Sequence, residues 1–327
     1  MGHDVCVGRL LLVEGAPGSG KTTTARLASR WLAGAGARVE VYCEGDPQPA
    51  DLAWQWWLAP AEFEAACRAH PGAEAELRRC AWVGAAGVAV AYTKVDVDRC
   101  GGQWPEVEAA MQGREPFNGS VPAATFMDIL TERWAEFGAS EGGPDAADVV
   151  VFDGAFLQNT LVELVLFAQR DADSITGDLR RLAESVASWR PLLLRLVPVD
   201  PASALKAVGR ERVDADGRPQ WLTSAEAYTA GSPWARARGL SPPGALQDYL
   251  AYRQRLEAEV LPRLPLQWVD LASPVGTCAP WGPFEEQLTA VLADVIDWVP
   301  EAPSPTRSAT ASGRRVRAAG DPGRYAG

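Results

Sequence analysis

Histidine is almost absent from this chain of 327 residues, and its cysteines form no recognisable motif. The two histidines are His3 and His70, which argues against histidine-based catalysis and a histidine-rich metal site. The six cysteines are scattered without a C-x-x-C pair, so neither a disulfide framework nor a zinc site has its usual spacing. We therefore expect reduced thiols and a cytoplasmic location.

Long hydrophobic runs are also missing. Apolar runs such as residues 149–152 and 192–199 are far shorter than the roughly 20 residues that a membrane helix needs. The apolar stretch at residues 10–13 is too short for a signal-peptide core of about 7–15 residues. We expect neither a membrane partner nor secretion.

Positive charge is in short supply. Lys and Arg number 31 against 42 Asp and Glu, which gives a formal net charge of -11. Nucleic-acid binding depends on neutralising phosphates with Lys and Arg, so a nucleic-acid partner is not expected. Lysine occurs three times, as Lys21, Lys94 and Lys206, so a lysine inside a motif stands out.

A phosphate-binding motif follows the first predicted strand, residues 9–14. Residues 15–22 satisfy G-x-x-x-x-G-K-[ST], and residues 23–32 continue with apolar side chains at helical spacing. In this strand–loop–helix context, backbone amides surround phosphates, Lys21 reaches the β- and γ-phosphates and Thr22 binds Mg²⁺. The residues expected to contact the nucleotide are Gly15, Pro17, Gly18, Ser19, Gly20, Lys21, Thr22 and Thr23.

A second acidic strand end is needed to complete the Mg²⁺ site. Residues 149–152 are apolar and lead into Asp153 and Gly154, as in a Walker B strand. Asp153 is therefore predicted to share the metal with Thr22. The alternative is that its carboxylate caps the helix that begins near Leu157.

Further strands are predicted at residues 39–43, 192–199 and 266–271, with helices near 174–189, 201–212, 245–261 and 284–298. Five strands separated by helices indicate an α/β protein with a parallel sheet covered on both faces. Residues 1–8 are predicted to be an N-terminal tail. Residues 299–327, rich in Pro, Ser, Ala, Gly and Arg, are predicted to be a disordered tail.

A long insert, residues 47–147, separates the second strand from the Walker B strand. It is predicted to be mostly helical, with segments near 61–69, 73–81 and 123–137. From Glu44 to Ala147 the chain has 17 acidic and 7 basic residues. This part also holds six of the 13 tryptophans: Trp54, Trp56, Trp57, Trp82, Trp104 and Trp134. Such an insert is suited to a cationic or ring-containing molecule, or else it is a helical subdomain with core tryptophans and a solvated acidic face.

A late segment, residues 203–240, carries several arginines between Gly and Pro. Mobile arginine-bearing segments close over the phosphate donor in many phosphoryl-transfer enzymes, because positive charge stabilises the transferring group. Arg210 and Arg212 are the candidates for this lid. For either one alone, a solvated helix end is the competing interpretation.

Taken together, the GAPGSGKTTTA loop, the Walker B carboxylate and the late basic segment resemble P-loop kinases of the thymidylate kinase and nucleoside kinase type. The Glu44-Gly45-Asp46 and FDGAFLQN (152–159) segments are similar to bacterial P-loop proteins described as thymidylate kinase-like or AAA-family ATPases. The resemblance spans residues 9–298. It implies a three-layer P-loop NTPase sandwich with strand order 2-3-1-4-5, ATP with Mg²⁺, and an acceptor pocket built from the insert. The Asp-Arg-Tyr usual in thymidylate kinases is replaced by Asp153-Gly154-Ala155, which argues against thymidylate.

The leading hypothesis is an ATP-dependent kinase that phosphorylates a hydroxyl or similar nucleophile of a small molecule, with a homodimer as the candidate assembly. Glu44 and Asp46, after the second strand, are candidates for a general base or an acceptor-binding carboxylate, with Asp46 preferred. One alternative is a GTPase switch, because residues 93–96 match [NT]-K-x-D and residues 98–101 match D-x-x-G, although in reversed order. Another is an ATPase that couples hydrolysis to a partner protein docked on the acidic insert.

Overall fold

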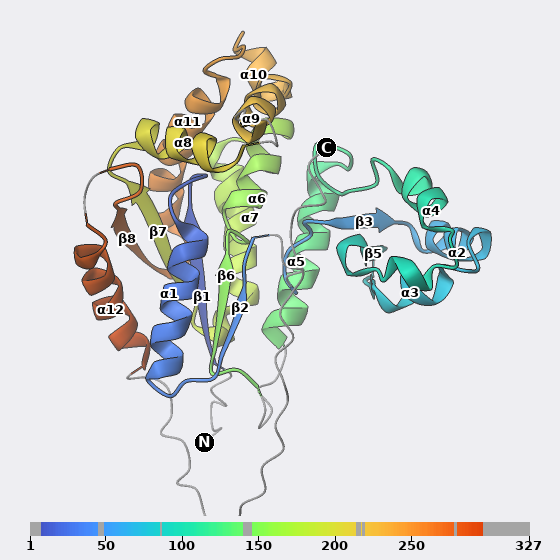
Figure 1. Ribbon diagram of the computed structural model, residues 1–327, viewed down its shortest axis with the longest axis horizontal. Coiled ribbons are helices and arrows are strands. Elements are labelled where there is room, and N and C mark those ends of the chain that lie inside the picture. Colours follow the sequence, from blue (N-terminus) through green and yellow to red (C-terminus); the bar gives the residue numbers. More distant parts are fainter. Residues whose placement is uncertain are drawn as a thin grey trace, which may run out of the picture.

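The computed structural model describes residues 8–44, 49–85, 87–139, 146–213, 217, 220–277 and 280–296. A five-stranded parallel sheet in the order β2-β6-β1-β7-β8 forms its centre (Figure 1). The strands are β1 (Arg9–Gly15), β2 (Val39–Tyr42), β6 (Val149–Asp153), β7 (Leu192–Pro198) and β8 (Gln267–Ser273). Renumbered within this sheet, the order is 2-3-1-4-5, so the predicted fold class is confirmed.

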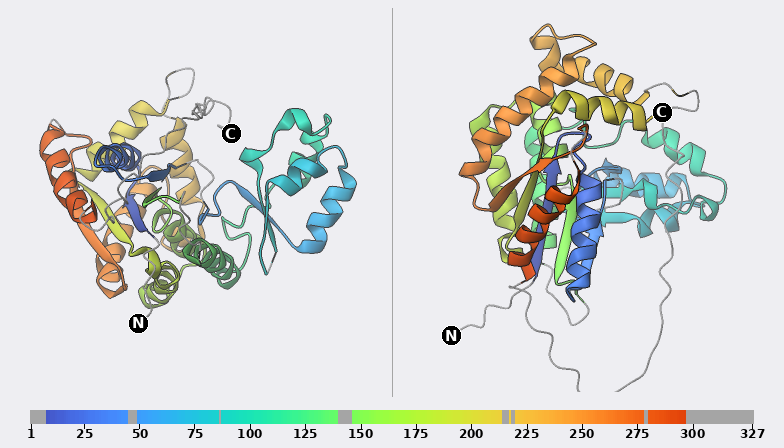
Figure 2. Two further views of the ribbon diagram at one scale, coloured as in Figure 1. Left: turned by 90° about the horizontal axis from the view of Figure 1, so that it is seen from below. Right: turned by 60° about the vertical axis from the view of Figure 1, so that its left-hand side comes forward.

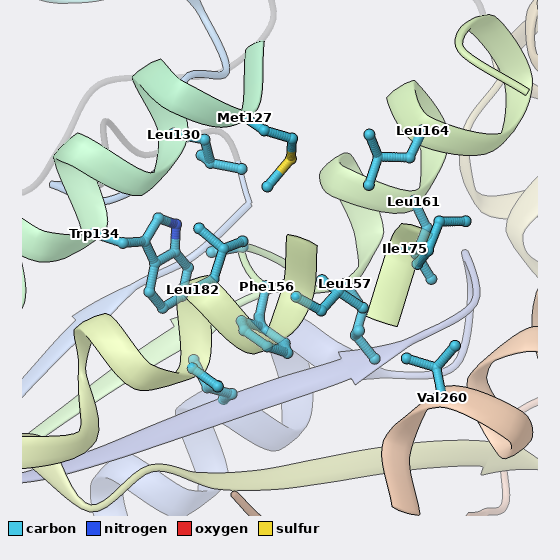
Figure 3. Packing of buried hydrophobic residues seen from close by; sticks show 14 of the residues in the cluster. Met127, Leu130, Trp134, Phe156, Leu157, Leu161, Leu164, Ile175, Leu182 and Val260 are labelled. Atoms are coloured by element: carbon cyan, nitrogen blue, oxygen red, sulfur yellow. The ribbon is translucent and has the colours of Figure 1, made fainter. Parts of the chain in front are cut away.

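Helices cover both faces of the sheet, because successive side chains of a strand point to opposite sides. Leu11 packs toward one layer and Leu12 toward the other. Figure 2 shows the first layer, and Figure 3 shows packing in the second. The first layer contains α1 (Lys21–Gly34) and α12 (Gly282–Ile296); the second contains α5 (Ala123–Ala139), α7 (Ala172–Ser185) and α11 (Ala245–Val260).

The insert contains a small sheet that the sequence analysis did not predict. Its three antiparallel strands lie in the order β3-β5-β4 and pack with helices around a separate apolar core (Figure 1). The strands have three or four residues each, too few for alternation to be recognised in the sequence. The elements are β3 (Gln55–Leu58), α2 (Pro60–Ala69), α3 (Glu74–Arg79), β4 (Ala81–Val83), β5 (Val88–Ala91), η1 (Tyr92–Lys94), η2 (Val97–Arg99) and α4 (Trp104–Met111).

The tryptophans of the insert divide between core and surface. Trp56 and Trp104 are buried in the core of the insert, whereas Trp134, on α5, is buried in the layer that covers the sheet. Trp54 is 42% exposed. Core packing therefore explains three of the six tryptophans, and Trp54 needs another explanation.

The remaining helices include those of the predicted lid and four short elements. The predicted lid contains α8 (Pro201–Glu211), α9 (Gln220–Ala230) and α10 (Pro233–Ala237), at the top of Figure 1. Asp200 caps α8 by accepting from the Ser203 amide at 3.1 Å, and Pro201 occupies the first turn. The other elements are α6 (Gln158–Leu161), the π-helical turn η3 (Val162–Phe167), η4 (Ala187–Trp189) and η5 (Leu261–Arg263).

Three further expectations from the sequence can be compared with the structure. Within the described ranges, no helix has the length and apolar character needed to cross a membrane. Cys67, Cys80 and Cys100 are free thiols buried in the insert. The predicted tails, residues 1–8 and 299–327, lie outside the described residues except for Gly8.

Candidate functional site

The site begins where β1 ends and α1 starts, as the motif predicts. The chain turns between Gly15 and Lys21, and the Ser19 amide closes the turn on the Ala16 carbonyl at 3.0 Å. The first turn of α1 contains no acidic residue. The backbone amides at the start of α1 and the positive end of its dipole therefore favour an anion at this place.

Thr22 and Asp153 meet although 131 residues separate them in the chain. The Thr22 hydroxyl donates to Asp153 Oδ2 at 2.6 Å, and the Glu44 amide donates to the same oxygen at 3.3 Å. Burial raises the pKa of Asp153, and the positive charge of Lys21 opposes that shift. The start of α1 and the ends of β2 and β6 thus supply one polar cluster, because the carboxyl ends of parallel strands share one edge of the sheet.

Lys21 is buried beside these acids, with 5% of its surface exposed. Burial lowers the pKa of its ammonium group, and the charges of Glu44 and Asp153 oppose the shift. Within the described part of the chain, the hydrogen bond found for its Nζ is a long one of 3.4 Å to the Ala16 carbonyl. The ammonium group is therefore positioned for a stronger anionic partner.

The side-chain oxygens of Thr22 and Asp153 are suitable ligands for Mg²⁺, which prefers hydroxyl, carboxylate and water oxygens. The described residues include no group of three or more His, Cys, Asp or Glu side chains that could hold a metal ion. Mg²⁺ commonly binds through one or two protein ligands, with substrate phosphates and water filling the other positions. The two residues fit that mode.

A cavity of about 440 Å³ adjoins the loop. The glycine loop, the start of α1, Glu44 and Gln158 form part of its wall. The lid forms one side, where the Arg212 guanidinium carbon lies 5.4 Å from the ring centre of Trp221. The loop after β8 and Trp281 form another side. Its volume falls in the range of ligand-binding cavities. The predicted site residues that line it are Pro17, Gly18, Gly20, Lys21, Thr22, Thr23, Glu44 and Arg212.

Four other predicted residues are not among the described lining residues of this cavity, and a fifth lies outside the described residues. One of the four is Asp153, which accepts from Thr22 as given above. Gly15 ends β1, and Ser19 is buried beneath the loop after β8, where its carbonyl accepts from the Ser273 hydroxyl at 2.7 Å. Among the described residues, those that line the cavity include Arg212 but not Arg210, although both are exposed. Asp46 lies outside the described residues, so its assignment rests on the sequence.

Glu14 has a structural role that the sequence analysis missed. Its fully buried carboxylate accepts from the backbone amides of Phe156 at 2.7 Å, Leu157 at 3.0 Å and Gln158 at 3.1 Å. It therefore caps the start of α6, so the alternative role of Asp153 as this cap is wrong. A glutamate at the end of a fully buried strand, directly before the glycine loop, was the available signal.

Gln158, Trp221 and Trp281 were also missed as cavity residues. Gln158 Nε2 donates to Glu44 Oε1 at 3.1 Å and so fixes the carboxylate predicted to face the substrate. Trp281 follows β8 and lies against Gly20 of the glycine loop. Its place after a parallel strand could have indicated the same sheet edge.

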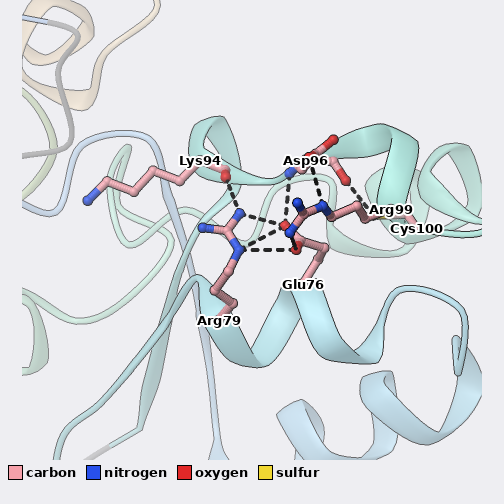
Figure 4. A network of polar contacts seen from close by, with 6 residues as sticks. All are labelled: Glu76, Arg79, Lys94, Asp96, Arg99 and Cys100. Atoms are coloured by element: carbon pink, nitrogen blue, oxygen red, sulfur yellow. Dashed lines mark hydrogen bonds and ion pairs between the residues drawn. The ribbon is translucent and has the colours of Figure 1, made fainter. Parts of the chain in front are cut away.

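The segment that matched guanine-reading motifs is a turn of the insert (Figure 4). Arg79 donates to the Lys94 carbonyl at 2.6 Å, and the Asp96 amide donates to Glu76 at 3.0 Å. The Asp96 carboxylate pairs with Arg99 at 3.2 Å. These contacts hold the turn to α3, and the described residues lining the cavity at the glycine loop include none of residues 93–96.

We expect Gly18→Ala to disturb the loop strongly. Gly18 has φ +76°, and a Cβ atom there would lie 2.2 Å from Val208 Cγ2 and 3.0 Å from the Ala204 carbonyl oxygen of α8. The left-handed backbone alone costs about 1–2 kcal/mol. Displacement of the loop should weaken the Mg-ATP binding that the motif predicts by about tenfold or more, measured by calorimetry.

The matched control is Gly34→Ala, at the end of α1, where an added Cβ meets nothing within 4 Å. This variant should bind Mg-ATP as the wild type does. Equal affinities for Gly18→Ala and the wild type would show that the loop does not surround the phosphates.

Neither a scan against models of known protein families nor a search of curated proteins finds a match for this chain. The fold class of the protein is therefore assigned from the structure. Its five-stranded parallel sheet, with a glycine loop between the central strand and the first helix, is compatible with a P-loop NTPase-like fold.

Proposed function

We propose that this protein is an ATP- and Mg²⁺-dependent phosphotransferase that transfers the γ-phosphoryl group to a small-molecule hydroxyl. One observation carries the proposal: a single cavity combines Lys21 and Thr22 of the loop, the strand-end acid Glu44 and the lid residue Arg212. A phosphate-binding loop, a carboxylate facing the acceptor side and a mobile positive charge are the parts that phosphoryl transfer uses. We also propose kinship with thymidylate and nucleoside kinases, and a cytoplasmic location.

In this mechanism the chain mainly positions and neutralises charge. Backbone N–H groups of residues 18–22 and the Lys21 ammonium group bind the β- and γ-phosphates, while Thr22 and Asp153 would hold Mg²⁺. Bound Mg²⁺ neutralises negative charge on the phosphates. Arg212, at the end of α8, adds positive charge when the lid closes over the donor.

In the transfer step one bond to the γ-phosphorus forms and one breaks. The acceptor oxygen forms a bond to the γ-phosphorus, and the bond from that phosphorus to the bridging oxygen breaks, so its electron pair leaves with ADP. The hydroxyl proton passes to a carboxylate or to water. Glu44, fixed by Gln158, and Asp46 are the candidate carboxylates, and either one serves as base or as acceptor-binding group.

Mass spectrometry tests the proposal most directly. The protein is incubated with Mg-ATP and a panel of nucleosides, aminated sugars and antibiotic-like compounds, and products are searched for one added phosphoryl group. A phosphorylated product from the wild type, absent for Lys21→Ala, is expected. ATP hydrolysis that no small molecule stimulates but a macromolecule does would instead favour the ATPase or GTPase alternative.

Arg212→Ala is expected to lower the rate of transfer by about 10²-fold or more, because an arginine that stabilises the transferring phosphoryl group contributes at least that much. Steady-state kinetics on the product found above provide the measurement. Arg210→Ala, two residues away and also exposed, should change the rate less than twofold, because Arg212 lines the cavity and Arg210 is not among its described lining residues. Equal losses in both variants would contradict a specific role for Arg212.

A further inference from the structure

A second cavity, of about 240 Å³, lies where insert, core and lid converge. The insert contributes Trp54 and Glu115, the core contributes Asn159 of α6, and the lid contributes Tyr228 of α9. Gln158 lines the cavity at the glycine loop and Asn159 lines this one. These two residues are consecutive in α6, so both cavities border the first turn of this helix.

Aromatic rings form much of this second cavity. Trp54 and Tyr228 are each 42% exposed, which is unusual for side chains so large, and Phe117 is half-buried. The Tyr228 ring packs edge-on against Phe167, and its hydroxyl donates to Asn118 Oδ1 at 2.6 Å. Exposed ring faces held in place in this way are suited to stacking with a planar ligand.

The backbone around the cavity is strained, which is a common feature of functional sites. Trp54 has φ +62° and Asn118 has φ +66°, both in the left-handed region. Asn118 and its neighbour Gly119 are held by the buried Glu163 carboxylate, which accepts from their amides at 2.8 and 3.0 Å. Glu163 belongs to the π-helical turn η3, a distortion often found near binding sites. The strain at Trp54 presents a large apolar ring to solvent rather than to a core.

The charge of the cavity is one-sided. Glu115 is an acid among the described lining residues, and these include no Lys, Arg or His. Its carboxylate accepts from the Tyr92 hydroxyl, and Asn159 is fixed by donating to the buried Asp51 at 2.8 Å. A phosphate group would therefore meet a carboxylate without a compensating cation, whereas an ammonium group would meet a favourable partner.

We propose that this second cavity binds the acceptor of the transfer as a planar ring compound of one or two rings, uncharged or singly cationic, that carries no phosphate. The size fits, since an engineered cavity of about 150 Å³ holds benzene. The inference rests on the proposed function. It separates this chain from kinases whose acceptors are nucleoside monophosphates, because such acceptors carry a phosphate.

The test uses three probes with one common ring. Pyridoxamine is cationic, pyridoxine is uncharged, and pyridoxine 5′-phosphate is anionic. Their affinities for the full chain are measured by ligand-observed NMR with Mg²⁺ and a non-hydrolysable ATP analogue present. We expect pyridoxamine to bind most tightly and the phosphate ester at least about tenfold more weakly. Equal or tighter binding of the phosphate ester, or no binding of any probe, would overturn the inference.

Substitutions test whether the probes bind in this second cavity. Glu115→Gln, which keeps an acceptor for Tyr92, should lower pyridoxamine affinity about fivefold and leave pyridoxine unchanged. Trp54→Ala should weaken both about fivefold. Glu108→Gln and Trp82→Ala, in the insert but outside the described cavity lining, are the controls and should bind as the wild type does. An unchanged pyridoxamine affinity in Glu115→Gln would contradict the assignment.

Calorimetry with Mg-ATP keeps the two proposals separable. If the wild type binds Mg-ATP and Lys21→Ala does not, while the phosphate ester is the preferred probe, the acceptor class is wrong and the kinase proposal stands. If the wild type binds no nucleotide, the kinase proposal fails whatever the probes show.

Discussion

Lys21→Ala is expected to abolish measurable phosphoryl transfer, with a loss of about 10²–10³-fold or more. Lys21 is a buried cation between the loop carbonyl of Ala16 and the acids Glu44 and Asp153. Preorganised charges of this kind contribute such factors when they meet the charge of a transition state. The same substitution should remove the thermal stabilisation by ATP, which for the wild type is about 2.7 kcal/mol at a ligand concentration 100 times Kd.

Lys94→Ala is the matched control. Lys94 is an exposed lysine of the insert, and the contact found for it uses its backbone carbonyl. Its removal should leave both transfer and thermal stabilisation unchanged. If Lys21→Ala retained the stabilisation by Mg-ATP, the glycine loop would not be the nucleotide site.

The central sheet was predictable because each of its strands carries a strong local signal. The β1 strand has an apolar run at residues 10–13 and β6 has one at residues 149–152, and each run leads directly into an acidic residue, Glu14 or Asp153. The small sheet of the insert was not predictable. Its strands pair through long-range backbone hydrogen bonds, and the Trp56 and Trp57 pair of β3 is as compatible with a helix as with a strand.

The site was predictable to the extent that residue type determines chemistry. The contact between Thr22 and Asp153 could be predicted from the glycine-loop motif and the strand order. The sequence could not distinguish Arg210 from Arg212, because two arginines near one helix end differ only in the direction they face. The second cavity was beyond prediction for a similar reason, since its residues come from three regions that only the fold brings together.

Glu14→Ala is expected to have the largest effect on stability. The substitution leaves the buried amides of Phe156, Leu157 and Gln158 without their acceptor. An unsatisfied buried donor costs about 1–3 kcal/mol, so the free energy of unfolding should fall by about 3 kcal/mol or more, measured by urea denaturation. Glu40→Ala, on the exposed side of β2, should change it by no more than about 0.5 kcal/mol. A small effect of Glu14→Ala would show that water replaces the carboxylate at this helix start.

Glu14→Gln separates the charge of this carboxyl group from its hydrogen bonds. Burial raises the pKa of Glu14 to about 7, although the backbone amides and Arg253 oppose the shift. Because the folded protein holds this proton more tightly than the unfolded chain, the group stabilises the fold most below about pH 4.5 and loses that contribution as the pH rises to about 7. Glutamine does not titrate, so the stability of the wild type relative to Glu14→Gln should fall by about 3 kcal/mol between pH 4.5 and 7.5. A difference that stays constant with pH would mean that Glu14 is ionised throughout, with Arg253 and the amides of α6 compensating its burial.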